Sequence, residues 1–233
     1  MDNTKESLNL YAKVEDLLEN SEAIDKLYGY YYNLLDDLEF KTLLDVGCGS
    51  GAFLRDVKSR YSPFIAKGID LSSVMVQRAR LKGVLAETID LCDLDGRFDI
   101  LTAVFDMLNY LPPSALKEFF ECVEAHLNDD GYFIFDINTD FGFANVAVGA
   151  YVVEDDYRFL AIDSDYEDDI YEATFTLFDR DGNSYHKLQD TITQHYHSIE
   201  SITEATNLNL VAIQEISLYD MGESDKLLLM FQK

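Results

Sequence analysis

Short apolar runs alternate with amphipathic segments between residues 42 and 137. Nearly continuous apolar runs are typical of strands that are buried on both faces of a sheet. In the segments between them, apolar residues recur every three or four positions, which predicts helices. The expected strands are 42–46, 64–69, 84–89, 98–105 and 132–137, and the expected helices between them include 72–81 and 114–127, with Ser72 and Ser114 as N-caps.

This alternation predicts an α/β fold, because parallel strands are joined through crossover helices. Two further apolar runs, 210–219 and 226–233, are separated by a short polar turn and predict a closing hairpin. We therefore expect a doubly wound, Rossmann-like sheet of seven mostly parallel strands with an antiparallel last strand.

The pattern changes after residue 140. Extended segments rich in Tyr, Phe, Thr and Val follow, and DRDGNS at 179–184 is a turn signal between two of them. They predict a small antiparallel β lid, inserted before the last helix. The expected parts are N-terminal helices at 1–40 that could act as a cap, a core at 41–140, the lid at 148–197, and a C-terminal helix and hairpin at 198–233. Within the first part, one helix is expected at about 4–19 and a second at 21–38.

Composition limits the classes of function. The 233 residues include 44 acidic and 18 basic side chains, a net charge of −26. Such a surface repels phosphate backbones, so we expect no nucleic-acid partner. No apolar run approaches the ~20 residues that span a bilayer. The N-terminus lacks a signal-peptide pattern, so we expect a cytoplasmic protein without a membrane partner. Monomer and homodimer stay open.

Three cysteines lie far apart and share no metal-ligand spacing. We expect free thiols at Cys48, Cys92 and Cys122, and no metal site. Cys48 lies within a glycine-rich stretch and so near any ligand bound there. It has no neighbouring His or Lys in sequence to activate it as a nucleophile.

That stretch is LLDVGCGSGAF, residues 43–53, between an expected strand and an expected helix. Bare backbone at Gly47, Gly49 and Gly51 lets a ligand approach closely, and the helix N-terminus offers free N–H groups. Asp70 ends the next strand, where a carboxylate can accept hydrogen bonds from ribose hydroxyls. An adenosine-type ligand is therefore expected at the carboxyl ends of the strands.

Two such ligands compete. The spacing G-x-G-x-x-A at 47–52 fits a dinucleotide fingerprint. A pyrophosphate, however, would lie close to Asp45, whose carboxylate suits a cation. S-adenosylmethionine carries a sulfonium and an ammonium group, which Asp45, Asp70 and Asp90 would attract.

Four ordered motifs resemble the class I S-adenosylmethionine-dependent methyltransferases. They are DVGCGSG at 45–51, GIDLS at 68–72, IDL at 89–91 and RFDILT at 97–102. The resemblance covers about residues 40–140, and the closing hairpin fits it as well. The stretch 106–139 is similar to small-molecule members, which include sugar-amine and glycine-type N-methyltransferases.

The resemblance implies a role for each matching residue. Asp70 would hold the ribose, and Leu71 would lie against the adenine. Asp90 and Leu91 would meet the adenine edge, with Asp93 as the alternative to Asp90. The methionine part would lie against Asp45, Gly47, Cys48, Gly49, Gly51 and Phe105.

Methyl transfer needs donor and acceptor held in line, so an obvious catalytic residue is not required. His195 and His197, at the exit of the lid, are the best-qualified proton acceptors, because histidine titrates near neutral pH. Tyr110 and Asp106 are further candidates. Other polar groups at the strand ends are Asn109, Asp136, Asn138 and Tyr196, while Tyr11 and the run Tyr28, Tyr30, Tyr31 and Tyr32 could close over the site.

The end of the fourth strand reads FDMLNY. It lacks the Asn/Asp-Pro-Pro-aromatic tetrad of methyltransferases that act on nucleic-acid bases. We therefore expect a methyltransferase that acts on a small molecule, with N-methylation slightly favoured over O-methylation. Two alternatives stay open: a nicotinamide-dependent oxidoreductase, and a non-catalytic regulatory module that binds S-adenosylmethionine.

Overall fold

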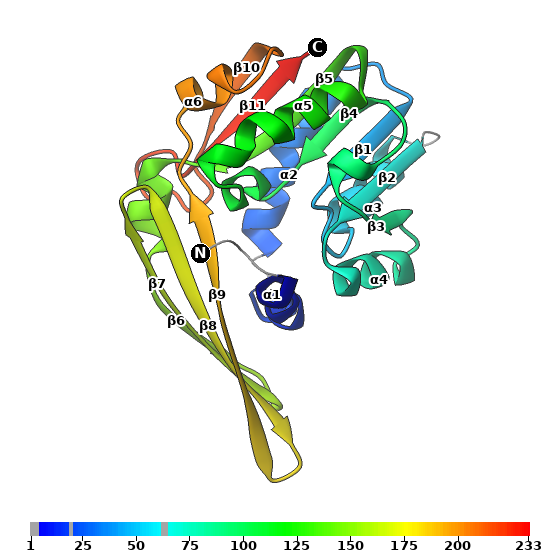
Figure 1. Cartoon of the computed structure of the whole chain (residues 1–233). Coiled ribbons are helices and arrows are strands. Elements are labelled where there is room, and N and C mark those ends of the chain that lie inside the picture. Colours follow the sequence, from blue (N-terminus) through cyan, green and yellow to red (C-terminus); the bar gives the residue numbers. More distant parts are fainter. Residues whose placement is uncertain (1–4, 19–20, 62–64) are drawn as a thin grey trace.

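The computed structural model describes residues 5–18, 21–61 and 65–233. Over these residues it contains a seven-stranded sheet in the order β10-β11-β5-β4-β1-β2-β3 (Figure 1). The ends of the helix expected at 4–19, and the first residue of the strand expected at 64–69, lie outside the described residues. The strands are β1 (Thr42–Val46), β2 (Ile65–Asp70), β3 (Ala86–Thr88), β4 (Phe98–Ala103), β5 (Leu127–Asn138), β10 (Asn209–Ile216) and β11 (Lys226–Gln232).

The pairing confirms the expected doubly wound sheet. β1 pairs in parallel with both β2 and β4, and β4 pairs in parallel with β5. β11 runs antiparallel to both β5 and β10, so the last strand is reversed as expected. The chain order reverses between β1 and β4, and ligands of open α/β sheets bind at such a switch point.

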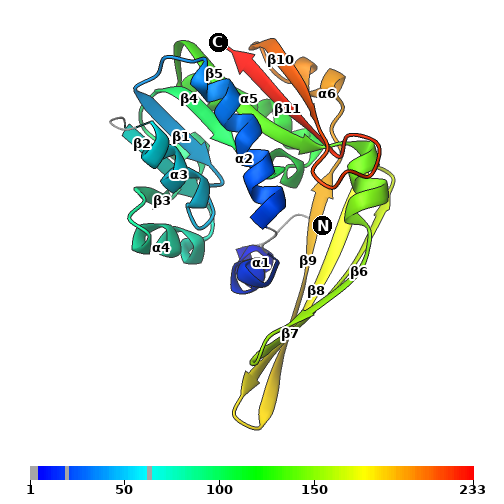
Figure 2. The same cartoon turned by 180° about the vertical axis from the view of Figure 1, so that it is seen from behind.

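Helices cover both faces of this sheet, as Figures 1 and 2 show. On one face, α2, α3 and α4 pack over apolar residues that include Leu43 and Ile134. On the other, α5 and α6 pack over residues that include Leu44 and Phe133. The helices are α1 (Lys5–Leu18), α2 (Ser21–Asp36), α3 (Ala52–Arg60), α4 (Ser73–Leu81), α5 (Leu116–His126) and α6 (Ile199–Glu204).

The two expected N-caps have different outcomes. The Ser72 hydroxyl accepts a hydrogen bond from the Met75 N–H and caps α4, as expected. The expectation for Ser114 was wrong: it lies within the short 3-10 helix η3 (Pro113–Ala115). The fixed φ of proline favours this tight turn, which delays α5 and leaves Ala115 at its N-cap position without a side-chain bond.

A separate antiparallel sheet, here called the lid sheet, extends away from the core (Figure 1). Helix α1 lies between the core and the lid sheet (Figure 2). Its Leu10 and Val14 pack against Leu160 and Phe175 on the inner face of the lid sheet. The lid strands are β6 (Gly149–Glu154), β7 (Arg158–Glu167), β8 (Ile170–Asp181) and β9 (Ser184–His195).

The expectation of three free thiols was wrong for two cysteines. Cys92 and Cys122 form a disulfide with a Cα–Cα distance of 5.1 Å. It links the 3-10 helix η1 (Leu91–Asp93) to α5, which pack together although 30 residues separate the two cysteines. Cys48 is a buried free thiol, as expected.

Over the described ranges, no helix has both the length and the apolar character needed to cross a membrane. Within the same ranges, no three His, Cys, Asp or Glu side chains are grouped so that they could hold a metal ion.

Gly68 of β2 lies in a tightly packed part of the core, behind the glycine stretch. A Cβ added there would lie 2.5 Å from the Cys48 Sγ and 2.8 Å from the Leu54 Cδ1. We expect Gly68→Ala to lower the free energy of unfolding by about 1–3 kcal/mol through overpacking. The control is Gly29→Ala in α2, where an added Cβ has nothing within 4 Å. That variant should gain about 0.5–1 kcal/mol, because alanine loses less conformational entropy in a helix. Urea denaturation measures both, and equal effects would contradict the packing argument.

Candidate functional site

The glycine stretch forms a tight loop between β1 and α3. Gly47, Gly49 and Gly51 have φ angles of +71°, +51° and +77°, a region that other residues rarely adopt. A Cβ at Gly47 would also lie 2.7 Å from the Met107 Cγ. The loop therefore keeps a bare backbone at the carboxyl end of β1, as the sequence predicted.

Cys48 turns its side chain away from this surface. It is 8% exposed, and its Sγ lies against the backbone of Gly68. Burial, followed by the charges of Asp45 and Asp70, raises the pKa of its thiol, so the reactive thiolate is disfavoured. Cys48 can reach a ligand only through its backbone.

Asp70 lies at the end of β2, directly beside the loop. Its Oδ2 accepts from the Gly49 N–H at 2.9 Å, and its Oδ1 accepts from the Ser72 N–H at 2.7 Å. Burial raises its pKa, and these two backbone bonds partly offset the rise. The carboxylate thus joins the glycine loop to the start of α4, at the place expected for a ribose contact.

Asp45 lies behind the loop and not on its surface. It is 2% exposed, and its Oδ1 accepts from the Thr102 Oγ1 at 2.7 Å. Burial, with a smaller contribution from the charge of Asp70, raises its pKa to about 7. Its charge near neutral pH therefore depends on what lies beside it, and a bound cation would favour the ionised form.

The residues expected at the adenine lie on the same edge of the sheet. Leu71 is 46% exposed, which suits an apolar platform for a ring. Asp90 is exposed and accepts from the Cys92 N–H at 2.9 Å, so it caps η1. The Leu91 side chain is buried in the core, which leaves its backbone for ligand contact. Asp93, the alternative to Asp90, is exposed at the end of η1.

The turn after β4 brings Phe105 to the surface between β1 and β5. Phe105 is 36% exposed, and its ring centroid lies 5.8 Å from that of Tyr28 on α2. Tyr28 itself is 6% exposed, and Tyr31 is fully buried. The tyrosine run of α2 therefore packs the helix onto the sheet, with Tyr28 reaching towards the expected methionine part.

The candidate proton acceptors lie near one another at the exit of β9 but in different environments. His195 is half-buried, and its carbonyl oxygen accepts a hydrogen bond from the Asn109 Nδ2 at 2.8 Å. His197 is 2% exposed, its Nε2 lies 3.0 Å from the Leu111 carbonyl, and burial lowers its pKa. His197 thus resembles a structural histidine.

The other two candidate proton acceptors, Tyr110 and Asp106, also interact with other side chains of the protein. Tyr110 packs against the cluster between α1 and the lid sheet, and burial raises the pKa of its hydroxyl. Asp106 is in an ion pair with Lys226, whose Nζ lies 2.5 Å from its Oδ1.

Helix α1 supplies residues that the sequence did not indicate. The Glu15 carboxylate accepts from the Ser50 Oγ of the glycine loop at 3.0 Å, and it pairs with Arg78 of α4 at 3.5 Å. The Ser72 Oγ donates to the Asn9 Oδ1 at 3.3 Å. Arg158 of β7 in turn pairs with Asp16 at 2.6 Å. The sequence predicted a helix at about 4–19, but it did not show which loops the polar side chains of this helix would contact.

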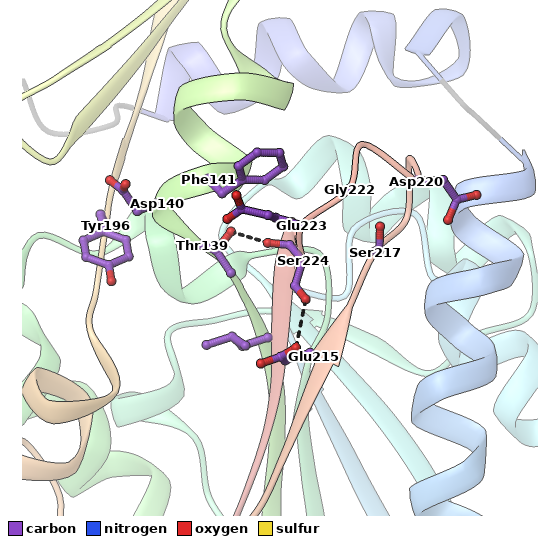
Figure 3. A pocket seen from close by; sticks show the side chains of 11 residues that line it. Thr139, Asp140, Phe141, Tyr196, Glu215, Ser217, Asp220, Gly222, Glu223 and Ser224 are labelled. Atoms are coloured by element: carbon purple, nitrogen blue, oxygen red, sulfur yellow. Dashed lines mark hydrogen bonds between the residues drawn. The ribbon is translucent and has the colours of Figure 1, made fainter.

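A cavity of about 830 Å³ lies at the carboxyl end of β5, between the β9 exit and the β10–β11 loop. In Figure 3 the Thr139 hydroxyl donates to the Ser224 carbonyl, and the Ser224 hydroxyl donates to Glu215. The cavity contains none of the expected cofactor residues and is strongly acidic. Its lining residues are Thr139, Asp140, Phe141, Tyr196, Glu215, Ser217, Asp220, Gly222, Glu223, Ser224 and Leu227.

Comparison with known proteins agrees with this geometry. Residues 43–131 match the family described as "Methyltransferase domain". A methyltransferase structure from Clostridium acetobutylicum ATCC 824, described as S-adenosylmethionine-dependent, superposes with a TM-score of 0.74 at 22% identity, covering 97% of this chain and 96% of that one. A sugar N-methyltransferase from Streptoalloteichus sp ATCC 53650 has a TM-score of 0.74 at 17% identity, covering 100% and 95%.

A third structure is an amino pentose methyltransferase from Micromonospora echinaspora with S-adenosylmethionine bound. It has a TM-score of 0.70 at 20% identity and covers 96% of both chains. No curated protein sequence matches the chain.

The sheet order and the fold likeness are those of S-adenosylmethionine-dependent methyltransferase structures, and the family match falls on the part of the sheet that carries the glycine loop. Residues 43–131 of the chain match this methyltransferase domain, and one of the similar structures has S-adenosylmethionine bound. The resemblance seen in the sequence motifs is thereby confirmed.

The raised pKa of Asp45 gives a prediction for stability. The folded protein holds this proton up to about pH 7, whereas an unfolded aspartate loses it near pH ~4. The stabilising contribution of the protonated form is therefore complete below about pH 4 and is lost as pH rises through 7. Between these limits it falls by about 1.4 kcal/mol per pH unit.

The isosteric variant Asp45→Asn keeps an acceptor for Thr102 but does not titrate. The free energy of unfolding of the wild type minus that of Asp45→Asn should fall between pH 5 and 7 and level off above about pH 8. Urea denaturation across this range measures the difference. A flat difference from pH 5 to 7 would show that Asp45 has an ordinary pKa.

Proposed function

We propose that this protein transfers a methyl group from S-adenosylmethionine to a small-molecule acceptor, with nitrogen slightly favoured over oxygen. The observation that carries the proposal is the bond between Asp70 and the Gly49 N–H, at 2.9 Å. It sets a carboxylate suited to ribose directly beside a bare, positive-φ backbone. This juxtaposition suits an adenosine whose short charged tail lies along the glycine loop.

The proposed cofactor contacts follow the strand ends. Asp70 holds the ribose, Leu71 lies against the adenine, and Asp90 and the Leu91 backbone meet the adenine edge. The exposure of Leu71 and Asp90 supports these roles. The methionine part lies against the loop and the β4 turn, at Gly47, Gly49, Gly51, Phe105 and the backbone of Cys48, with the charge of Asp45 acting from behind the loop.

When bound, S-adenosylmethionine supplies an activated methyl group on a positively charged sulfur. The contribution of the chain is position, since holding donor and acceptor in line is worth about 7–11 kcal/mol. Phe105 and Tyr28 form an aromatic wall beside the expected methionine part. An amine that arrives neutral needs no base. Where a proton must leave, His195 is our preferred acceptor, because the ring of His197 is buried against a carbonyl.

Three observations support an amine acceptor. The net charge of −26 attracts cations over a long range. The cavity beside β5 is lined by four carboxylates, Asp140, Glu215, Asp220 and Glu223. Two of the similar structures are described as an amino pentose methyltransferase and a sugar N-methyltransferase.

The proposed organisation follows the same division as the sequence. Residues 1–40 act as a cap, of which α1 covers the glycine loop through Glu15 and Ser50. Residues 41–140 bind the cofactor, and residues 148–197 form the lid. Residues 198–233 complete the core sheet with β10 and β11.

Asp70→Ala tests the cofactor site. We expect affinity for S-adenosylmethionine and S-adenosylhomocysteine, measured by calorimetry, to fall roughly 10–100-fold, because charge-assisted hydrogen bonds contribute about 1.5–3 kcal/mol. Asp129→Ala, at the exposed amino end of β5 and so at the opposite edge of the sheet, removes the same charge and should leave affinity unchanged. Thermal melts serve as the check that both variants are folded. Unchanged affinity in Asp70→Ala would contradict the proposed site.

A panel of small amines, including aminosugars, and their hydroxyl analogues tests the acceptor. Mass spectrometry should detect methylated amines, with slower or no methylation of the analogues. Methylation of the hydroxyl analogues alone would overturn the preference for nitrogen. Cofactor binding without methylation of any acceptor would favour a regulatory module. NADH binding in the absence of S-adenosylmethionine binding would favour an oxidoreductase.

A further inference from the structure

The turn after β4 has an unusual backbone. Phe105 and Asp106 are consecutive residues with positive φ angles, +60° and +48°, and neither is glycine. This backbone conformation is unfavourable for a residue with a side chain, so it persists only where the surroundings hold it. The turn also presents Phe105 at the expected methyl-transfer site, so its shape matters for any reaction there.

Asp136 of β5 accepts hydrogen bonds from the backbone of this turn. Its Oδ1 accepts from the Phe105 N–H at 2.8 Å, and its Oδ2 accepts from the Asp106 N–H at 2.9 Å. The Tyr31 hydroxyl of α2 donates to Oδ1 at 2.7 Å. The carboxylate has no exposed surface. Its bonds to two successive peptide N–H groups fix the orientation of both peptides.

Lys226, the first residue of β11, places a positive charge beside both Asp136 and Asp106. Its Nζ lies 3.0 Å from the Asp136 Oδ2 and 2.5 Å from the Asp106 Oδ1. Burial alone would lower its pKa, but the two carboxylates outweigh burial and raise it. Lys226 therefore stays charged. Without it, two carboxylates would face each other inside the protein, which is strongly unfavourable.

Gln194 connects the lid sheet to the same turn. Its Nε2 donates to the Asp106 Oδ2 at 2.5 Å, while the other oxygen of Asp106 is in contact with Lys226. Asn109 strengthens the connection, since its Nδ2 donates to the His195 carbonyl and its Oδ1 accepts from the Asn138 N–H. The end of β9 is thus tied to the ends of β4 and β5 by side chains with defined partners.

We propose that Lys226 is a positioning residue for methyl transfer, and that Asp106 connects the β4 turn to the lid sheet and does not act as the general base. Lys226 and Asp136 hold the turn of Phe105 and Asp106 in shape, and Gln194 places the lid against it. The proposal rests on the proposed function for its catalytic consequence. The contacts of Lys226 and Asp136 with the turn, and of Gln194 with Asp106, are here called the clamp. The clamp is present in the protein without ligands.

The first experiment measures the clamp without any activity. Hydrogen exchange, followed by mass spectrometry over residues 103–111, should show protected amides at the turn in the wild type. Lys226→Met should raise their exchange at least tenfold. Because this variant leaves buried carboxylates unpaired, Lys226→Met combined with Asp106→Asn is the second variant, which removes one charge of each sign. Unchanged protection in a folded form of either would overturn the clamp.

The second experiment measures its consequence with the acceptor found in the panel. In either folded Lys226 variant, kcat should fall about 100-fold, since small misplacements of reacting groups have effects of that size. Affinity for S-adenosylhomocysteine should stay within about threefold of the wild type. Gln194→Leu should lower kcat in the same way. The matched control is Gln189→Leu, an exposed position on the same strand, which should change nothing.

Asp106→Asn separates positioning from base catalysis. As a positioning residue, Asp106 can be replaced with a loss in kcat of less than about tenfold and an unchanged pH–rate profile. A general base would cost about 10²–10⁴-fold, with loss of the acidic limb of the profile, and this result would overturn the proposal. So would a full kcat in a Lys226 variant whose turn exchanges freely. Absence of any methyl transfer would contradict the proposed function and leave the exchange result standing.

Discussion

The turns at the carboxyl ends of the parallel strands depend on carboxylates that accept hydrogen bonds from backbone N–H groups. Asp136 does so most completely, with the N–H groups of both Phe105 and Asp106 on its two oxygens. Asp70 does the same between the glycine loop and α4. Loops that leave a parallel sheet have unpaired donors, and a carboxylate that takes two of them shapes the turn. The two turns are therefore shaped by side chains of the protein itself.

The same edge is where the three parts of the molecule meet. Helix α1 contacts the glycine loop through Glu15, and it contacts the lid sheet through Arg158 and Asp16. The lid sheet reaches the β4 turn through Gln194. These polar contacts cross between layers whose apolar packing is otherwise separate.

The local sequence pattern was sufficient to predict the architecture, but it did not predict the disulfide or the N-cap of α5. Alternating strands and helices predicted the sheet, and the closing hairpin predicted its reversed last strand, because each follows from short-range periodicity. The Cys92–Cys122 disulfide and the missing cap at Ser114 were not predicted. The first depends on how η1 packs on α5 across 30 residues, and the second on two prolines that reshape the approach to α5.

The sequence by itself determined the ligand edge. Glycine spacing and the strand-end acids Asp45, Asp70 and Asp90 are local features, and their chemistry predicts an adenosine-type ligand with a cationic tail. Tertiary structure decided what the remaining polar groups do. In the sequence, His197 was ranked with His195 as a proton acceptor, and Asp106 was a further candidate. In the structure, the Leu111 carbonyl lies beside His197 and Lys226 lies beside Asp106. A side chain acquires its role from partners far away in the chain, and only folding brings those partners within hydrogen-bond distance.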